Sequence, residues 1–95
     1  MEAIVLNEKD NVATAVVDLV SGQEVSVIMV DDEIQRVKVA RDISLGHKFA
    51  LATICKGQPI VKYGEVIGIA TEDIKTGGYV HVHNVESQRG RGDRL

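Results

Sequence analysis

The fold is decided by the stretch DISLGHKF at residues 42–49, because three other stretches of the chain repeat its pattern. The copies read DLVSGQEV at 18–25, TICKGQPI at 53–60 and DIKTGGYV at 73–80. Each begins with Asp or Thr, continues with Ile or Leu, and has Gly at its fifth position. An Asp or Thr side chain can accept hydrogen bonds from the backbone N–H groups that follow it, and Gly readily adopts positive φ. Each copy therefore predicts one tight turn, started by the acid or hydroxyl and ended by the glycine.

The segments around these turns are typical of β-strands. Val and Ile make up 24 of the 95 residues, and Pro59 is the only proline, in a chain with nine glycines. No stretch of 11 or more residues has the apolar spacing of an amphipathic helix. We therefore predict a mostly β domain over residues 1–85, followed by a flexible basic tail over 86–95. The predicted strands are 3–6, 12–17, 24–30, 34–40, 48–52, 61–63, 66–70 and 79–83.

Charge and cysteine content exclude several classes of protein. The net charge is −3, and residues 1–85 alone carry eight basic and twelve acidic side chains, which argues against a nucleic-acid or anionic-membrane surface. The single cysteine, Cys55, excludes an internal disulfide, and we interpret it as a semi-buried filler. The N-terminus lacks the basic segment and long apolar run of a signal peptide, so we expect a cytoplasmic protein.

Three further motifs resemble a known family. They are GHK at 46–48, KYGEVIG at 62–68 and HVHN at 81–84, and together with the four turns they resemble the SAF domain of the altronate and galactarate dehydratase family. The resemblance implies a SAF-like β-clip with short one-turn helices at the turn motifs. In that family the domain is N-terminal or a separate small subunit. The resemblance thus implies a large catalytic subunit as partner, and we also consider a homo-oligomer.

The resemblance also implies an activity. The chain would be a hydro-lyase subunit of the altronate dehydratase type, which eliminates water from an aldonate to give a 2-keto-3-deoxy acid. The resemblance implies little activity in the absence of the large subunit. It further implies a divalent metal, iron first, in the assembled enzyme. A similar small subunit occurs in sulfolactate sulfo-lyase, so the substrate stays open. A non-catalytic assembly or lid module and a carbohydrate-binding clip are two competing hypotheses.

The candidate site residues come from the GHK and HVHN motifs. His81 and His83 are two apart on a predicted strand, so they would share one face. Ordinary surface histidines explain such a pair equally well, and two ligands do not complete a zinc-like metal site. The resemblance favours a function: His81, His83 and His47 as catalytic groups, with His81 and His83 also candidate metal ligands. Lys48 and Asn84 are the predicted substrate-binding residues, because sugar acids need cations and hydrogen-bond donors.

Overall fold

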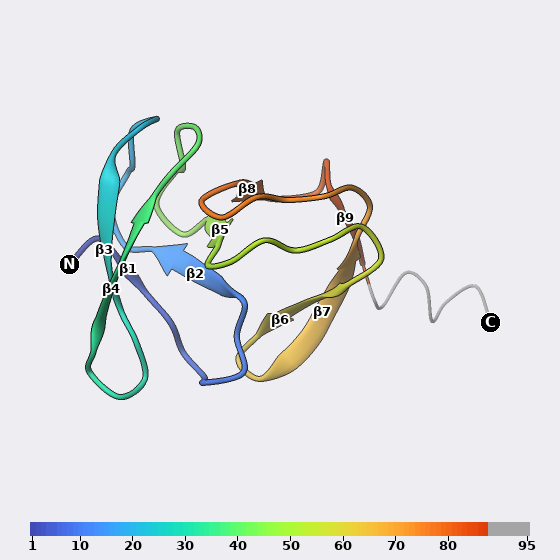
Figure 1. The fold of residues 1–95 in the computed structure, drawn as a ribbon, viewed down its shortest axis with the longest axis horizontal. Coiled ribbons are helices and arrows are strands. Elements are labelled where there is room, and N and C mark those ends of the chain that lie inside the picture. The colour runs from blue at the N-terminus through green and yellow to red at the C-terminus, as the bar shows by residue number, and fades with distance from the viewer. Residues whose placement is uncertain (88–95) are drawn as a thin grey trace.

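The computed structural model describes residues 1–87, and every regular element in that range is a β-strand (Figure 1). The larger sheet has six strands in the order β4-β3-β1-β2-β5-β8, and the smaller has three in the order β6-β7-β9. Only β1 and β3 are parallel neighbours; the other paired strands are antiparallel. The strands are β1 Ala3–Ile4, β2 Val12–Ala15, β3 Glu24–Ile28, β4 Ile34–Lys38, β5 Lys48–Ala50, β6 Pro59–Lys62, β7 Glu65–Ala70, β8 Tyr79–Val80 and β9 Val85–Ser87.

The predicted mostly β fold is confirmed, and all eight predicted strands are present. The ninth, β9, was not predicted, because Val85–Ser87 has one apolar residue and no alternation. It carries regular structure two residues past the expected domain end at 85, and the rest of the predicted basic tail lies outside the described residues. No helix in the described range is long and apolar enough to span a membrane.

The repeated motifs form β-turns, and the expected one-turn helices are absent from residues 1–87. In the first copy the carbonyl of Val20 accepts from the N–H of Gln23 at 2.9 Å, which closes a four-residue turn. Gly22, the third residue, has φ of +84°. Positive φ at the third position defines a type II turn, and this geometry does not continue into a helix. The glycines of the other three copies have φ between +82° and +90°.

The turns associate in two pairs, which the sequence did not reveal. Leu19 and Ile43 exchange backbone hydrogen bonds, and so do Ile54 and Ile74. The motif acids serve the partner turn rather than their own, contrary to our expectation. Asp18 accepts from the N–H of Leu45, and its equivalents Asp42 and Asp73 accept from residues 21 and 56, all at 2.7–2.8 Å. Each acid therefore stabilises a turn distant in sequence.

The two turn pairs belong to two halves of the domain with equivalent backbone contacts. Gly22 N–H donates to Val39 in the first half, and Gly57 N–H donates to Ala70 in the second, at 2.9 and 2.8 Å. Gly46 N–H likewise donates to Ala15, as Gly77 N–H donates to residue 50, both at 2.8 Å. The equivalence aligns residues 15–25 with 50–60 and residues 39–49 with 70–80. The fold is thus an internal duplication of one clip-like unit.

Each half has its own apolar cluster. The aliphatic residues at the second motif position, Leu19, Ile43, Ile54 and Ile74, are all at most 3% exposed. The first two belong to a cluster with Val25, Val27, Val37 and Phe49, and the other two to one with Val12, Ile60, Ala70 and Val80. Burial of each such side chain contributes about 1.5–3 kcal/mol. These residues fix the turns, and the turns fix the strands that leave them.

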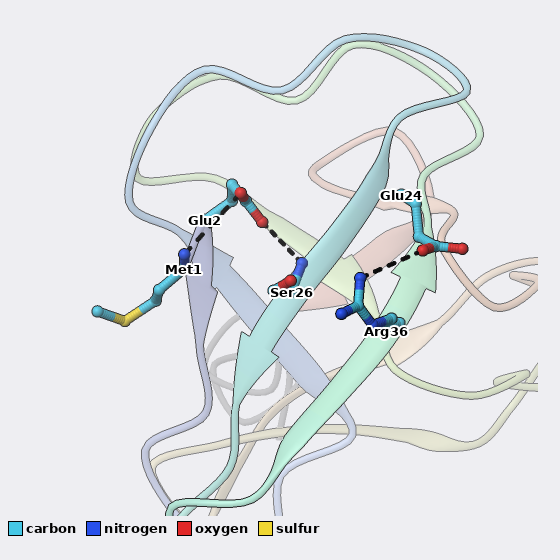
Figure 2. A network of polar contacts seen from close by, with 5 residues as sticks. All are labelled: Met1, Glu2, Glu24, Ser26 and Arg36. Atoms are coloured by element: carbon cyan, nitrogen blue, oxygen red, sulfur yellow. Dashed lines mark hydrogen bonds and ion pairs between the residues drawn. The ribbon is translucent and has the colours of Figure 1, made fainter.

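Two hairpins complete the domain. In the β3–β4 hairpin Arg36 reaches Glu24 at 3.5 Å, and Glu2 accepts from the N–H of Ser26 at 2.7 Å, which ties the N-terminus to β3 (Figure 2). The β6–β7 hairpin turns at Tyr63 and Gly64, both with positive φ, as a two-residue type I′ hairpin turn requires. Cys55 is exposed on its turn rather than semi-buried, because the turn presents its third residue to solvent.

Candidate functional site

The second and fourth turns lead into strands that pair with each other, and this pairing assembles a ring cluster, defined as His47, Tyr79, His81 and His83. β5 and β8 are antiparallel neighbours, with Lys48 opposite Val80 and Phe49 opposite Tyr79. One further step of this register places His47 opposite His81. His47 directly precedes β5 and His81 directly follows β8, and both rings lie against that of Tyr79.

The rings of the cluster are in contact. The His47 and His81 ring centres lie 4.8 Å apart, and each ring is stacked on Tyr79, at 5.7 and 5.1 Å, with planes within 18° of parallel. His83 lies against Tyr79 at 5.5 Å, tilted by 34°. The Tyr79 hydroxyl is hydrogen-bonded to Nδ1 of His47. The structure thus brings together the three predicted histidines around a tyrosine that the sequence reasoning had not singled out.

The two histidines of the HVHN motif reach the cluster by a different route from the one predicted. β8 ends at Val80, so His81 and His83 lie in a turn and do not share a strand face. Asn84 builds this turn. Its Oδ1 accepts from the N–H of His81 at 3.0 Å, and its Nδ2 donates to the carbonyl of Tyr79 at 2.7 Å. Asn84 is 4% exposed, and its hydrogen bonds position the backbone that carries His81 and His83; its predicted contact with substrate stays a prediction.

Two cations flank the rings. Lys48 is half-buried on β5, and desolvation, followed by the nearby charge of Lys62, lowers the pKa of its ammonium group. The Arg41 guanidinium lies over the Tyr79 ring, with Cζ 5.1 Å from the ring centre. Desolvation also lowers the pKa of His81, and the charges of His47, Lys48 and His83 lower it further. His81 is therefore mainly neutral near pH 7 and can accept a proton.

An open pocket adjoins the cluster. It has a volume of about 250 Å³ and is lined by Lys48, Ile67, Val80, His81, Val82, Val85 and Ser87. Ligand pockets commonly enclose about 300–1,000 Å³. A small molecule would therefore be enclosed here only if a second surface covered it. Val82, between the two motif histidines, is 81% exposed at the pocket's edge.

A metal centre does not fit the described residues. Within 1–87 no three His, Cys, Asp or Glu side chains are placed to bind one ion. The stacked, nearly parallel rings of His47 and His81 turn their faces rather than a common set of nitrogens toward each other. The candidate ligands His81 and His83 therefore have no third partner among these residues, whereas catalytic zinc sites use three.

The duplication shows that the turn itself does not require Arg41 or His47. Where the second turn has Arg41, the fourth has Glu72, and where it has His47, the fourth has Gly78. Both turns form the same hydrogen bonds with these different side chains. Arg41 and Tyr79 escaped the sequence reasoning, because their role depends on the β5–β8 pairing. A comparison of the turn copies position by position could have drawn attention to Arg41.

Comparison with known proteins identifies the family of this chain. The altronate/galactarate dehydratase SAF domain matches residues 1–88. This chain belongs to that family. The SAF domain is 45% identical over 87 residues to altronate dehydratase of Escherichia coli, covering 92% of this chain and 17% of the relative. It is 38% identical over 84 residues to altronate dehydratase of Bacillus subtilis, covering 88% and 16%. The chain thus spans about one sixth of these relatives' length.

A second kind of relative has nearly the length of this chain. The SAF domain is 30% identical over 91 residues to (2R)-sulfolactate sulfo-lyase subunit alpha of Chromohalobacter salexigens, covering 94% of this chain and 97% of the relative. Its counterpart in Paracoccus pantotrophus is 38% identical over 63 residues, covering 66% and 94%. The family therefore includes both a domain within a longer lyase and a subunit of this size.

Proposed function

We propose that this SAF domain is the small subunit of a sugar-acid dehydratase of the altronate type, active together with a large catalytic subunit. The ring cluster carries this proposal: three imidazoles and two cations meet beside an open pocket, and the duplicated turn has Glu72 and Gly78 in place of Arg41 and His47. The names of the long relatives, both altronate dehydratases, favour an aldonate as substrate.

The cluster suits the elimination of water from a 2,3-dihydroxy acid. Neutral His81 accepts the proton from C2, next to the carboxylate, and the C–H electron pair forms the C2–C3 double bond. The hydroxyl on C3 leaves and takes up a proton to become water. The resulting enol converts to the 2-keto-3-deoxy acid. Lys48 faces the pocket beside His81, where its charge would stabilise the negative charge that develops on the carboxylate.

The proposal requires a second surface over the pocket. The open volume of about 250 Å³ and the exposed Val82 both fit a site that is completed by another chain. We propose that the iron expected for the assembled enzyme is held by residues of the catalytic subunit, because the described residues here supply no set of three ligands. The same proposal places the enzyme in the cytoplasm.

A sulfo-lyase subunit is the second candidate, favoured by the match over nearly the full length of two alpha subunits. The chemistry differs in the leaving group alone: a proton leaves the carbon next to the carboxylate, and sulfite leaves the neighbouring carbon. The cluster suits both reactions, since each begins at an acidic C–H.

Reconstitution tests the proposal. The purified chain is mixed with a large subunit of the family, and release of 2-keto acid is followed with altronate and, separately, with 3-sulfolactate. We expect turnover of altronate by the mixture and little by either chain alone. Turnover of sulfolactate alone would support the second candidate. Equal activity of the large subunit with and without this chain would reduce the SAF domain to an assembly or lid module.

A further inference from the structure

We propose that Arg41 binds the acid group of the substrate, so that the ring cluster holds the acid end of the ligand while His81 faces the reacting carbon. This inference rests on the proposed function, which gives the ligand as a small organic acid. Arg41 belongs to neither of the motifs that supplied the other site residues. Its position became apparent only from the pairing of β5 with β8.

The guanidinium group is oriented but unpaired. Its Cζ lies 5.1 Å from the centre of the Tyr79 ring, at a distance typical of a cation–π contact. Within residues 1–87 the Arg41 side chain forms no ion pair and no hydrogen bond. The neighbouring carboxylate of Asp42 is engaged by the N–H of Ser21 at 2.8 Å. The N–H donors of an arginine that is held on an aromatic face are thus available to a ligand.

The surroundings favour an anion. His47, His81 and His83 contact the same tyrosine as Arg41, and Lys48 is close enough to His81 to lower the pKa of its ring. No carboxylate makes an ion pair with any of these groups in the described part of the chain. The two cations at the cluster, Arg41 and Lys48, thus have no carboxylate to pair with in this part of the chain, and a bound anion would offset their charge.

The duplicated turn argues that Arg41 is not there for folding. Glu72 occupies the equivalent position and precedes Asp73, whose carboxylate accepts from Lys56 N–H as that of Asp42 accepts from Ser21. The same turn thus forms with either sign of charge at this position. A positive charge is found only on the copy that faces Tyr79.

The chemistry of guanidinium fits an oxyanion. Its planar N–H groups can donate two parallel hydrogen bonds to a carboxylate or a sulfonate, which a lysine ammonium cannot do. Arg41 and His81 both lie about 5 Å from the centre of the Tyr79 ring, at 5.1 Å in each case. Both groups therefore border the same tyrosine, and the proposal places the acid group of the ligand on Arg41 and its C2 proton toward His81.

Titration of the full chain, followed by the imidazole NMR signals, tests this inference without the catalytic subunit. The probes are altronate, which carries a carboxylate, 2-hydroxyethanesulfonate, which carries only a sulfonate, and altritol, which is neutral. We expect one or both acids to shift the signals of His47 and His81, and altritol to leave them unchanged. The acid that binds more tightly shows whether the site prefers a carboxylate or a sulfonate.

Variants connect the binding to Arg41. Arg41→Gln should lower the affinity for the preferred acid about tenfold or more, as expected when a pair of charged hydrogen bonds is lost. Arg41→Lys should recover part of that affinity. Arg36→Gln is the matched control, since Arg36 is an exposed arginine paired with Glu24 on the β3–β4 hairpin. Unshifted signals with both acids up to their solubility limit, or equal affinity of Arg41→Gln and wild type, would overturn the proposal.

The outcome is separable from that of the proposed function. In the assembled enzyme, Arg41→Gln should raise KM for the acid about tenfold or more and change kcat less. If the Arg41→Gln enzyme is active and its KM is unchanged, Arg41 does not bind the substrate, and the proposed function still holds. If the chain binds the acid through Arg41 but activates no lyase, the anion site is supported and the proposed function is contradicted.

Discussion

At the scale of the residue, Gly77 is the most tightly enclosed of the turn glycines. A Cβ at this position would lie 2.0 Å from the carbonyl oxygen of Lys38, whereas one at Gly57 would meet nothing within 4 Å. Both glycines have φ above +80°, which costs an L-residue about 1–2 kcal/mol. We expect Gly57→Ala to lower the free energy of unfolding by about that amount and Gly77→Ala by about 3 kcal/mol or more, because overpacking adds to the strain.

Urea denaturation of the two glycine variants and the wild type measures the difference. Because Gly57 occupies the same motif position in the partner turn of this pair, its alanine variant isolates the backbone strain from the clash. Equal unfolding midpoints for the two variants would contradict the close approach of the fourth turn to β4.

The motif acids give a second prediction at this scale. Asp42→Ala removes the acceptor for the Ser21 N–H. By analogy with lost helix caps, it should destabilise the domain by about 1 kcal/mol. For a domain of this size the melting temperature should fall by about 4–8 °C. Asp42→Asn keeps an oxygen acceptor and should retain most of the stability. Identical losses in the two variants would show that the charge, and not the hydrogen bond, matters.

The pKa of His81 gives a third prediction. Desolvation and three positive neighbours should make it titrate below its ordinary value of 6.5 by NMR. Lys48→Met should raise this pKa only in part, because desolvation is the larger cause. The unfolded chain binds the His81 proton more tightly than the folded chain does, so protonation of His81 favours unfolding. The contribution of His81 to the free energy of unfolding is therefore complete above pH 6.5 and falls as the pH drops through the folded pKa. A pKa at or above 6.5 in the wild type would contradict the site's electrostatics.

At the scale of the element, Asn11 joins the two sheets. It follows the first loop and precedes β2. Its Nδ2 donates to the carbonyl of Pro59 at 2.9 Å, and its Oδ1 accepts from the N–H of Val61 at 2.8 Å, so both partners lie on β6. Asn11→Ala should lower the free energy of unfolding by about 1–3 kcal/mol, because the part-buried N–H of Val61 loses its acceptor.

Thermal unfolding, followed by a signal from each of the two sheets, tests whether Asn11 holds the sheets together. Asn7→Ala in the same loop is the control, since the Asn7 side chain accepts a hydrogen bond within its own loop, from the N–H of Lys9 at 3.0 Å. If Asn11→Ala melted like the control variant, β6 would be held to the larger sheet by apolar packing alone.

The elements themselves were largely predictable, but their partners were not. The β-branched runs and the Tyr63-Gly64 turn have local signatures, so strands and hairpins follow from sequence. The pairing of turns does not, because Asp18 and Asp42 bind across 27 and 21 residues rather than within their own turns. The convergence of His47 on His81 arises because β5 and β8 are neighbours, which no local pattern encodes.

The residue roles were harder to predict for the same reason. A regular strand through His83 was expected, yet Asn84 ends it by binding back to Tyr79 and His81. The motif therefore predicted a strand where the structure has a turn. Arg41 carried no motif and acquired meaning only from its position over an aromatic ring.

At the scale of the whole molecule, we propose that the described structure presents part of a site. The pocket of about 250 Å³ is open, and the cluster that borders it has bases and cations without a metal centre of its own. A lyase that uses this surface must complete it from another chain or domain. The long altronate dehydratases have most of their length outside the matched region, and the alpha subunits of sulfo-lyases have almost none. Both arrangements are consistent with a site shared between two folded units.

The central claim is that the ring cluster takes part in catalysis rather than in assembly, and the kcat of the reconstituted enzyme with His81→Ala tests it most directly. Loss of a proton-transferring group should lower kcat about a hundredfold or more, with the affinity between the subunits unchanged. An unchanged kcat, or a loss that disappears when the small subunit is in excess, would contradict the claim and assign the SAF domain to assembly alone.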